Sequence, residues 1–534
     1  MPDLVVFRHV AKRSVKSGAI WGLVFGGLVA GSATGYTSSF PDQASRQKLA
    51  DGFGGNLGIS ALVGPARQLQ TAAGYTEWRT VGILGIVGAT WALLFATRHL
   101  RGEEDTGRWE LLLSGPTNGQ RATAQVLAGF AVGWLTLWAI NAVSGLAVGG
   151  GDDIGFSTGG SLLLGVAVCA SALEFLAIGA LASQLMPTRH GANQLAAATL
   201  GAAYLVRLVA DSSSSLQWLR WASPLGWAEE LHPLTGARPI ALVPIAALAI
   251  VLAVASVVLA GRRDVGGAVL AAREGRGPRL RLLRGQTGLS IRLLTPSLLG
   301  WSIGLAVTGA VFGMVAQSAA DSITGSTVIE DALARLGDTS EGAAAYLGLT
   351  LAIAAATIAF AAASHVTAAR TEEADGRVDN LVVAPLDRRH WLLGRVGIGA
   401  ALVVVISVLT GITAWAGAAS QHTSIGLGSL VLAGLNRAPP GLFVLGIGTL
   451  ALGVWPRVTS FVVYGIVAWS FVVEFIGALV ESNRWLLDSS LLHHLAPAPA
   501  TDPRWSSALV MVAIGAAATA LGVVAFGRRD VQSA

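Results

Sequence analysis

Apolar residues occur along this chain in long blocks that are separated by short polar stretches. Most blocks are about twenty residues long, the length that a helix needs to cross roughly 30 Å of hydrocarbon. Stretches such as 391–417 are apolar on every face rather than at alternate positions, so they predict spanning helices and exclude a transmembrane barrel. Twelve spans are predicted, at 18–36, 79–99, 123–148, 160–185, 192–210, 240–260, 295–317, 343–366, 391–418, 425–452, 458–480 and 506–526.

The composition supports this prediction of an all-α integral membrane protein. Of 534 residues, 53% are hydrophobic and 13% are charged, whereas soluble domains carry about 25% charged residues. Cys169 is the single cysteine and lies in an apolar block, which excludes an internal disulfide and a cysteine-based metal site. His232, His493 and His494 belong to no metal-binding motif, so we expect lone surface histidines, no metal and no membrane-embedded enzyme.

The positions of Lys and Arg predict the orientation. An even number of spans puts both termini on one side, and 25 of the 36 Lys and Arg residues fall in the termini and loops of that side. Positive loops stay in the cytoplasm. We therefore expect an inner (plasma) membrane protein with both termini cytoplasmic. This topology accounts for the formal net charge of +5, so no nucleic-acid partner is expected.

A repeated motif predicts two homologous halves. Residues 103–116 align without gaps with residues 372–385, with six identical positions that include both glutamates, the glycine and the arginine. Two further pairs follow in the same order, Pro187 with Pro456 and the sequence Gly-Arg-Arg-Asp-Val at 261–265 with 527–531.

The predicted organisation is a first six-helix half at 1–265, a basic cytoplasmic linker at 266–292 and a second six-helix half at 293–534. Because each half has six spans, both copies enter from the same side, and an axis along the membrane normal relates them. A pathway between the halves is expected.

The repeated motif lies between the second and third span of each half, on the predicted cytoplasmic side. Gly107 and Gly376 are expected to end the preceding helix, and Pro116 and Pro385 to end a short helix that lies across the membrane surface. The charged pairs Arg108/Glu110 and Arg377/Asp379 would then face outward, and Leu112/Leu113 and Leu381/Val382 would pack on the bundle. An ordinary charged loop is the alternative, and the second copy argues against it.

This motif resembles the coupling segment of ABC-2-type exporter permeases, in particular the fused actinobacterial form associated with tetronasin-type antibiotic or multidrug export. The resemblance implies a short helix that docks on an ABC ATPase, two ATPase copies per permease chain, and ATP and Mg on that partner rather than any cofactor on this chain. It also implies a lipophilic, drug-like substrate, in line with the apolar spans. The implied ATPase-coupling residues are Glu103, Glu104, Gly107, Arg108, Glu110, Glu372, Glu373, Gly376, Arg377 and Asp379.

The sequence contains no P-loop. Its three lysines, Lys12, Lys16 and Lys48, lie outside any Gly-rich phosphate-binding pattern. Energy must come from a partner or from an ion gradient. Gradient-driven transport through the intramembrane carboxylates Glu174 and Glu474 is the alternative function.

Four charged residues fall inside predicted spans: Glu174, Arg207, Arg437 and Glu474. None is expected to face lipid, because an unpaired charge near the bilayer centre costs at least about 2.5 kcal/mol. Arg437 and Glu474 lie at similar depths on neighbouring antiparallel spans, which predicts an ion pair. Pairing of Glu174 with Arg207 is left open, as is the choice between a packing role and a place on the export pathway.

Two further features bear on the membrane helices and outer loops. The pattern Gly22-xxx-Gly26, followed by Gly27, Gly31 and Gly35, predicts close helix packing by the first span. On the predicted outer side, loops 37–78 and 318–342 are long, and the polar segment near 212–233 is expected to form either a re-entrant or an interfacial helix.

Overall fold

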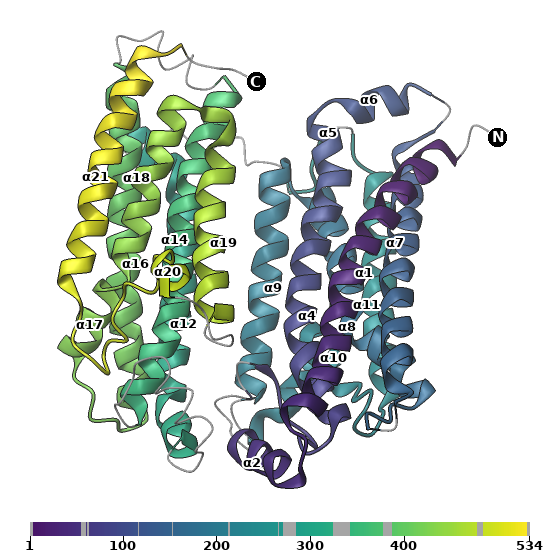
Figure 1. Ribbon diagram of the computed structural model, residues 1–534. Helices are drawn as coiled ribbons and strands as arrows, with labels where there is room; N and C mark the ends of the chain where they lie inside the picture. The colour runs from purple at the N-terminus through teal and green to yellow at the C-terminus, as the bar shows by residue number, and fades with distance from the viewer. Residues whose placement is uncertain are drawn as a thin grey trace. The chain divides into compact units, whose positions relative to one another are not determined.

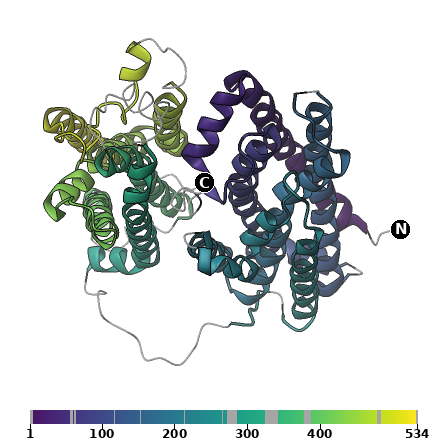
Figure 2. The same ribbon diagram turned by 90° about the horizontal axis from the view of Figure 1, so that it is seen from below.

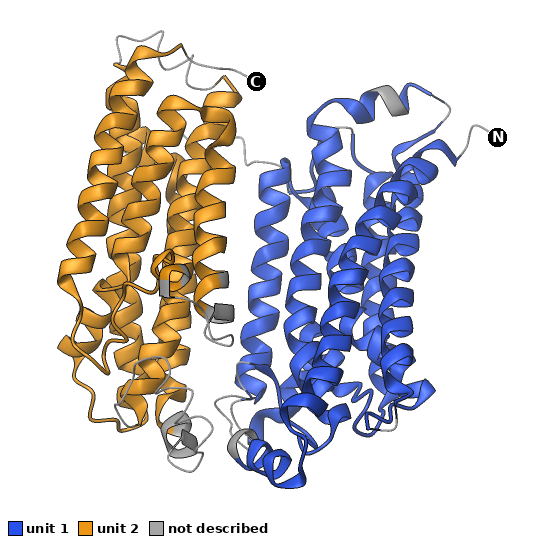
Figure 3. Cartoon of the chain, viewed as in Figure 1, with its two compact units in different colours: residues 1–276 blue, residues 277–534 orange. Residues whose placement is uncertain are grey.

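A computed structural model shows a chain of helices (Figure 1). It describes residues 4–54, 60, 63–115, 117–151, 153–211, 214–264, 266–270, 285–323, 342–376, 387–477 and 484–530. Within these ranges every regular element is a helix. The chain divides into two compact units, Met1–Arg276 and Gly277–Ala534 (Figure 3).

In its described residues, unit 1 is a bundle of six long helices joined by short ones, and Figure 2 shows it from below. The long helices are α1 (Val5–Ser39), α4 (Ala72–Thr97), α7 (Gly119–Gly149), α8 (Thr158–Leu185), α9 (Arg189–Asp211) and α11 (Leu242–Ala260). The short elements are α2 (Gln43–Phe53), η2 (Arg98–Gly102), α5 (Glu103–Asp105), α6 (Arg108–Leu113), η3 (Ser214–Ala222), α10 (Pro224–Glu230) and η4 (Pro239–Ala241).

Unit 2 has the same order of long helices, with one of them interrupted. They are α12 (Gln286–Ile323), α14 (Ala343–Ala374), α16 (Arg388–Ser420), α17 (Leu427–Leu435) followed by α18 (Ala438–Val454), α19 (Thr459–Gly477) and α21 (Trp505–Arg528). The short elements are η5 (Pro456–Val458) and α20 (Arg484–Asp488). Asn436 and Arg437 interrupt the predicted span 425–452 between α17 and α18.

Ten helices in the described ranges are long and apolar enough to cross a membrane, which confirms a multi-pass architecture. The other two predicted spans, 192–210 and 458–480, correspond to α9 and α19. Polar residues such as Asn193 and Arg207 lower the hydropathy of α9, and the described part of α19 ends at Gly477.

Each unit has two distinct ends. We call the end that carries the repeated motif the motif end, and the other the far end. In unit 1 the motif end comprises α5, α6, the start of α7 and the end of α11, whereas α2, η3 and α10 lie at the far end (Figure 1). In unit 2 the end of α14, the start of α16 and the end of α21 form the motif end.

Glycines allow close helix packing at some of the predicted positions. A Cβ on Gly22 would lie 3.0 Å from Ile140, and one on Gly26 would lie 2.3 Å from Ser144, so α1 meets α7 along this face. Gly27, Gly31 and Gly35 have open space around them instead. The first glycine pair therefore packs as predicted, and the following three do not, because they lie on another face of α1.

Helix α12 begins before the predicted first span of unit 2. Gly266 and Gly267 are hydrogen-bonded to unit 1, and α12 begins at Gln286, inside the predicted linker 266–292. Residues 271–284 lie outside the described ranges, as does most of the predicted loop 318–342. Helical structure thus extends beyond the apolar core of the first span of unit 2.

Candidate functional site

Both predicted glycine breaks are present in the backbone. Gly107 has a φ of +74° between α5 and α6, and Gly376 has a φ of +68° just after α14. Residues with a Cβ rarely adopt this left-handed region, whereas glycine does so at little cost. The two copies of the motif thus turn the chain in the same way at equivalent positions.

Helix α6 presents its charges outward, as the repeat predicted. Arg108 and Glu110 are exposed, with 61% of the Arg108 side chain accessible. Trp109 is buried and Leu113 packs against the core of unit 1, so the helix is anchored by one face. The anchoring role of Trp109 was missed, although an aromatic residue between two charges on a short helix is a recognisable signal. Arg377, Asp379, both prolines and the Leu112 side chain lie outside the described part of the chain.

The first glutamate of each motif is half-buried and paired. Glu103 accepts a hydrogen bond from Arg108 at 2.9 Å and a longer one from Arg13 at 3.5 Å. Glu372 accepts from Arg395 on α16. The pairs of Glu103 lie at the surface of the motif end, because the Arg108 and Arg13 side chains are exposed, whereas Arg395 is buried beneath Glu372.

The second glutamate of each motif is buried. Both oxygens of Glu104 accept from Arg263, at 2.5 and 2.7 Å. The Gly266 N–H donates to it at 2.7 Å, and Arg101 lies 3.3 Å away. Only 4% of the Glu104 side chain is exposed. Glu104 is therefore unavailable for direct contact with another chain and acts inside unit 1.

Unit 2 repeats this arrangement. Both oxygens of Glu373 accept from Arg529, at 2.5 and 2.9 Å, and Arg370 lies 3.7 Å from the same carboxylate. We call the pairs Glu104–Arg263 and Glu373–Arg529 the two clamps. Each joins the repeated Glu-Glu motif to the repeated Gly-Arg-Arg-Asp-Val motif of its own unit. The sequence showed both repeats in one order, but not that they meet.

Arg101 ties several connections of unit 1 together. Its buried guanidinium donates to the carbonyls of Gly266 at 2.9 Å and Gly267 at 2.8 Å, and also to the carbonyl of Pro187. It pairs with Asp105 at 3.1 Å, and Asp105 accepts in turn from the backbone N–H of Arg189. The motif is thereby fixed to the α8–α9 connection and to the chain after α11.

A groove of about 190 Å³ lies beside α6 at the motif end. Its apolar walls are Trp109, Leu113 and Ala260, and its polar rim includes Gln120 and Asp264. The clamp residues Glu104 and Arg263 also line it. The groove thus adjoins both the anchored face of the short helix and the buried clamp that holds it.

Three of the four charged side chains in predicted spans are buried, and the fourth, Glu474, is partly exposed. Glu174, Arg207 and Arg437 are at most 1% exposed, whereas 21% of the Glu474 side chain is accessible. Neither carboxylate oxygen of Glu174 has a hydrogen-bond partner among the described residues. Arg207 pairs instead with Asp211 and Glu229, so Glu174 and Arg207 do not pair with each other.

The predicted ion pair between Arg437 and Glu474 is wrong. Arg437 donates to the carbonyl of Ala498 at 2.8 Å and lies 3.5 Å from that of Gly348. Glu474 accepts from Ser490 at 3.4 Å and lies 3.8 Å from His493. The two charged groups do not meet, although their predicted depths in the membrane are similar. Arg437 lies at the break between α17 and α18, and its guanidinium contacts backbone carbonyls of neighbouring segments.

A second charged site, which the sequence reasoning missed, lies at the far end of unit 1. Arg207 Nε is 3.2 Å from Glu229 and 3.5 Å from Asp211. Arg220 pairs with Asp211 at 2.5 Å and with Glu230 at 3.4 Å. These pairs fix η3 and α10 to the end of α9, so the segment predicted as re-entrant or interfacial is held by buried charges.

His232 is part of this charged site and not the lone surface histidine that was expected. It is buried, has a φ of +43°, and its Nδ1 lies 2.5 Å from Arg67. Its Nε2 is 3.6 Å from Glu230. The pattern Glu-Glu-x-His at 229–232, next to a proline, was the available signal.

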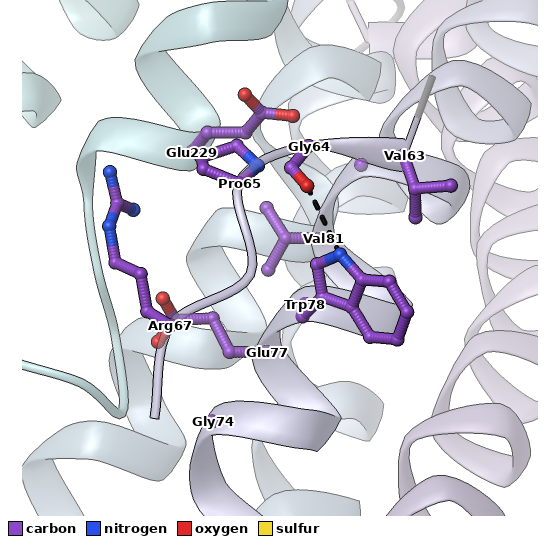
Figure 4. A pocket seen from close by; sticks show the side chains of 10 residues that line it. Val63, Gly64, Pro65, Arg67, Gly74, Glu77, Trp78, Val81 and Glu229 are labelled. Atoms are coloured by element: carbon purple, nitrogen blue, oxygen red, sulfur yellow. Dashed lines mark hydrogen bonds between the residues drawn. The ribbon is translucent and has the colours of Figure 1, made fainter. Parts of the chain in front are cut away.

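Small residues make room for Glu229. Figure 4 shows its carboxylate beside Gly64 and Pro65. The Trp78 indole N–H donates a hydrogen bond to the Gly64 carbonyl at 3.1 Å. A Cβ on Gly64, whose φ is +107°, would lie 2.7 Å from Glu229 Oε1. Burial raises the pKa of Glu229 to about 8, although the Arg207 charge opposes this shift.

Glu229→Gln should therefore change how stability depends on pH. Folded Glu229 keeps its proton up to about pH 8, whereas the unfolded residue loses it near its ordinary pKa of 4.5. The folded state binds more protons in this window, so the free energy of unfolding falls as pH rises, by at most about 1.4 kcal/mol per unit, and levels off above it. Thermal unfolding of E229Q should show a shallower slope, and E110Q should keep the wild-type slope. Equal slopes for E229Q and wild type would exclude this role.

Two family matches cover most of the chain. Residues 4–260 match the ABC-2 family transporter protein family, and residues 283–527 match the C-terminal domain of the multidrug efflux system permease Rv1217c. The chain belongs to the ABC-2 family and is the permease subunit of an ABC exporter. The resemblance inferred from the repeated motif is confirmed.

One similar protein is the "Multidrug efflux system permease protein Rv1217c" of Mycobacterium tuberculosis (strain ATCC 25618 / H37Rv). The two chains are 32% identical over 515 residues, which cover 94% of this chain and 90% of the relative. The similarity therefore extends through both units.

Proposed function

We propose that a separate ABC ATPase drives export and that this chain contacts it through the two copies of the repeated motif. The exposed charges of α6 support this proposal most directly, since Arg108 and Glu110 face outward while Trp109 anchors the helix. One permease chain would then hold two ATPase copies, with ATP and Mg bound on those partners.

The residues of the motif divide into two roles in this proposal. Glu103, Arg108 and Glu110, with Glu372, Arg377 and Asp379, contact the ATPase. Glu104 and Glu373 position the motif through the clamps, and Gly107 and Gly376 provide its turn. This division refines the expectation that the ten residues couple the chain to the ATPase.

The proposed orientation places both motif ends in the cytoplasm. The motif end of unit 1 includes Arg13, Arg101, Arg108 and Arg263, and arginine-rich loops remain on the cytoplasmic side. Both termini then lie in the cytoplasm, and the charged site at the far end of unit 1 faces outward across the plasma membrane.

Lipophilic, drug-like molecules are the proposed cargo. The similar permease is named for multidrug efflux, and apolar side chains dominate the spanning helices of this chain. The intramembrane charges Glu174, Arg207, Arg437 and Glu474 are proposed to serve packing, since three of them are buried within their own unit.

Reconstitution tests the energy source. Vesicles that contain this chain and its partner ABC ATPase should accumulate a lipophilic dye only when ATP is supplied, and the permease alone should hydrolyse no ATP. Transport by the permease alone, driven by a proton or sodium gradient, would instead support the alternative of a secondary transporter that uses the intramembrane carboxylates Glu174 and Glu474.

Reversing the arginine of each motif copy should disrupt ATPase binding. In R108E R377E we expect affinity for the ATPase to fall about tenfold or more per reversed charge, because like charges then meet at the interface. Co-purification with the tagged ATPase measures the loss. R121E reverses an exposed arginine at the start of α7, outside the motif, and should bind normally. Wild-type binding by R108E R377E would show that docking occurs elsewhere.

A further inference from the structure

A cavity of about 500 Å³ lies at the far end of unit 1, away from the repeated motifs. Its walls carry three arginines, one glutamate, one histidine and two tryptophans: Arg67, Arg220, Arg238, Glu230, His232, Trp218 and Trp221. Cavities of this size hold small molecules or headgroups. Nothing in the coupling of ATP hydrolysis to transport requires it.

Arg67 is the least neutralised of these arginines. Its guanidinium makes one hydrogen bond within the described residues, from Nη1 to Nδ1 of His232 at 2.5 Å, and no ion pair. The side chain is half-buried. The carboxylates of Glu230, Glu77 and Glu229 act on Arg67 only from beyond ion-pair distance. A charged group that is withdrawn from water without a direct counter-ion is costly, so an anion bound beside Arg67 would be favoured.

Among the residues that line the cavity, the arginines outnumber the carboxylates. Glu230 serves both Arg220 at 3.4 Å and Arg238 at 3.3 Å. Asp211 pairs with Arg220 from the α9 side. Glu77 is near His232, but it already accepts from the Leu234 N–H and the Thr235 hydroxyl, both at 2.8 Å. Three guanidiniums thus line the cavity against one carboxylate.

The two tryptophans indicate that the ligand also has an apolar part. Trp218 is 66% exposed and Trp221 is 42% exposed, and both lie on η3 at the far end. Tryptophan is enriched where a membrane meets water. An arginine-lined cavity next to exposed indole rings suits a molecule with an anionic head and a hydrocarbon tail, since guanidinium binds phosphate and carboxylate through paired hydrogen bonds.

We propose that this cavity binds the anionic headgroup of an amphiphile, with Arg67 and Arg238 as its principal ligands and Trp218 against its apolar part. The headgroup belongs either to a membrane phospholipid or to a soluble phosphate compound. This site is independent of the proposed ATPase contact, because it involves only the far end of unit 1.

Native mass spectrometry of the purified full chain tests the proposal with two lipids. Phosphatidylglycerol should bind in preference to phosphatidylcholine, and each guanidinium removed should weaken its binding about tenfold, as expected for a charge-assisted contact. The variants are R238Q, whose side chain is 61% exposed in the wild type, and R67Q R238Q. R504Q, an exposed arginine in unit 2, is the matched control and should bind like wild type.

A competition experiment with inorganic phosphate distinguishes the two sources of the headgroup. Displacement of the lipid by inorganic phosphate would show that the headgroup alone is recognised. Retention of phosphatidylglycerol in excess phosphate would show that the site takes a lipid with its tail. Equal binding of the two lipids, or unchanged phosphatidylglycerol binding by both R238Q and the double variant, would overturn the proposal.

Discussion

Glu104→Gln is expected to abolish coupled transport and to destabilise unit 1. Glutamine keeps the shape of the side chain but removes the charge that neutralises Arg263 and Arg101, which are 12% and 2% exposed. Breaking a buried ion pair by removing one member costs about 3–5 kcal/mol. Thermal unfolding and ATP-driven efflux of the reconstituted complex measure both effects.

Glu103→Gln is the matched control. Glu103 precedes Glu104 directly but pairs near the surface with Arg108 and Arg13, so its loss should change stability by about 1 kcal/mol or less. Glu373→Gln should reproduce the Glu104→Gln defect, because it breaks the equivalent clamp. The loss of stability in the double variant E104Q R263Q should be smaller than the sum of the losses in E104Q and in R263Q. An equal loss of stability in E103Q and E104Q would remove the distinction between contact and positioning residues.

Exchanging the charges of Arg437 and Glu474 is expected to prevent folding of unit 2. Arg437 donates to backbone carbonyls and is 1% exposed, so a glutamate in its place would set a carboxylate against the Ala498 carbonyl. The carbonyl would lose its donor, and an unpaired charge would be buried, at a cost of about 3 kcal/mol or more. Expression level and monodispersity of R437E E474R should be as poor as those of R437E alone.

Glu474→Gln provides the comparison at the other position. Glu474 is partly exposed and its nearest partners are Ser490 and His493, so E474Q should fold with a stability within about 1 kcal/mol of wild type. Rescue of R437E by E474R would mean that the two side chains meet after all.

The helical architecture and the turn of the motif could be read from the sequence. Long apolar blocks have few structural solutions in a membrane, and Gly107 and Gly376 occur where a left-handed residue is needed. The second copy of the motif then distinguished it from an ordinary charged loop. These features depend on local sequence, so local sequence reveals them.

The hydrogen-bond and ion-pair partners of the buried charged side chains could not be predicted from the sequence in the same way. The rise along a helix gives the depth of Arg437 and Glu474 but not the direction in which each side chain points. The break after α17 also redirects Arg437 toward the Ala498 and Gly348 carbonyls. Every residue has a backbone carbonyl, so the sequence does not mark the carbonyls that accept from Arg437. A search for residues of opposite charge could not identify these partners.

The charged site at the far end of unit 1 was missed for a related reason. Arg207, Arg220 and Glu229 come from different elements, and each alone resembles a loop charge or an isolated intramembrane charge. Only the fold brings them within ion-pair distance.

Each clamp closes within its own half of the chain. A gene duplication would thus have copied both members of the pair at once, and neither half needed the other to complete it. Substitutions at Glu104 require compensation at Arg263 but none at Glu373 or Arg529, so the halves were free to diverge elsewhere. Expressed as two polypeptides cut within 277–284, the halves would each keep a complete clamp.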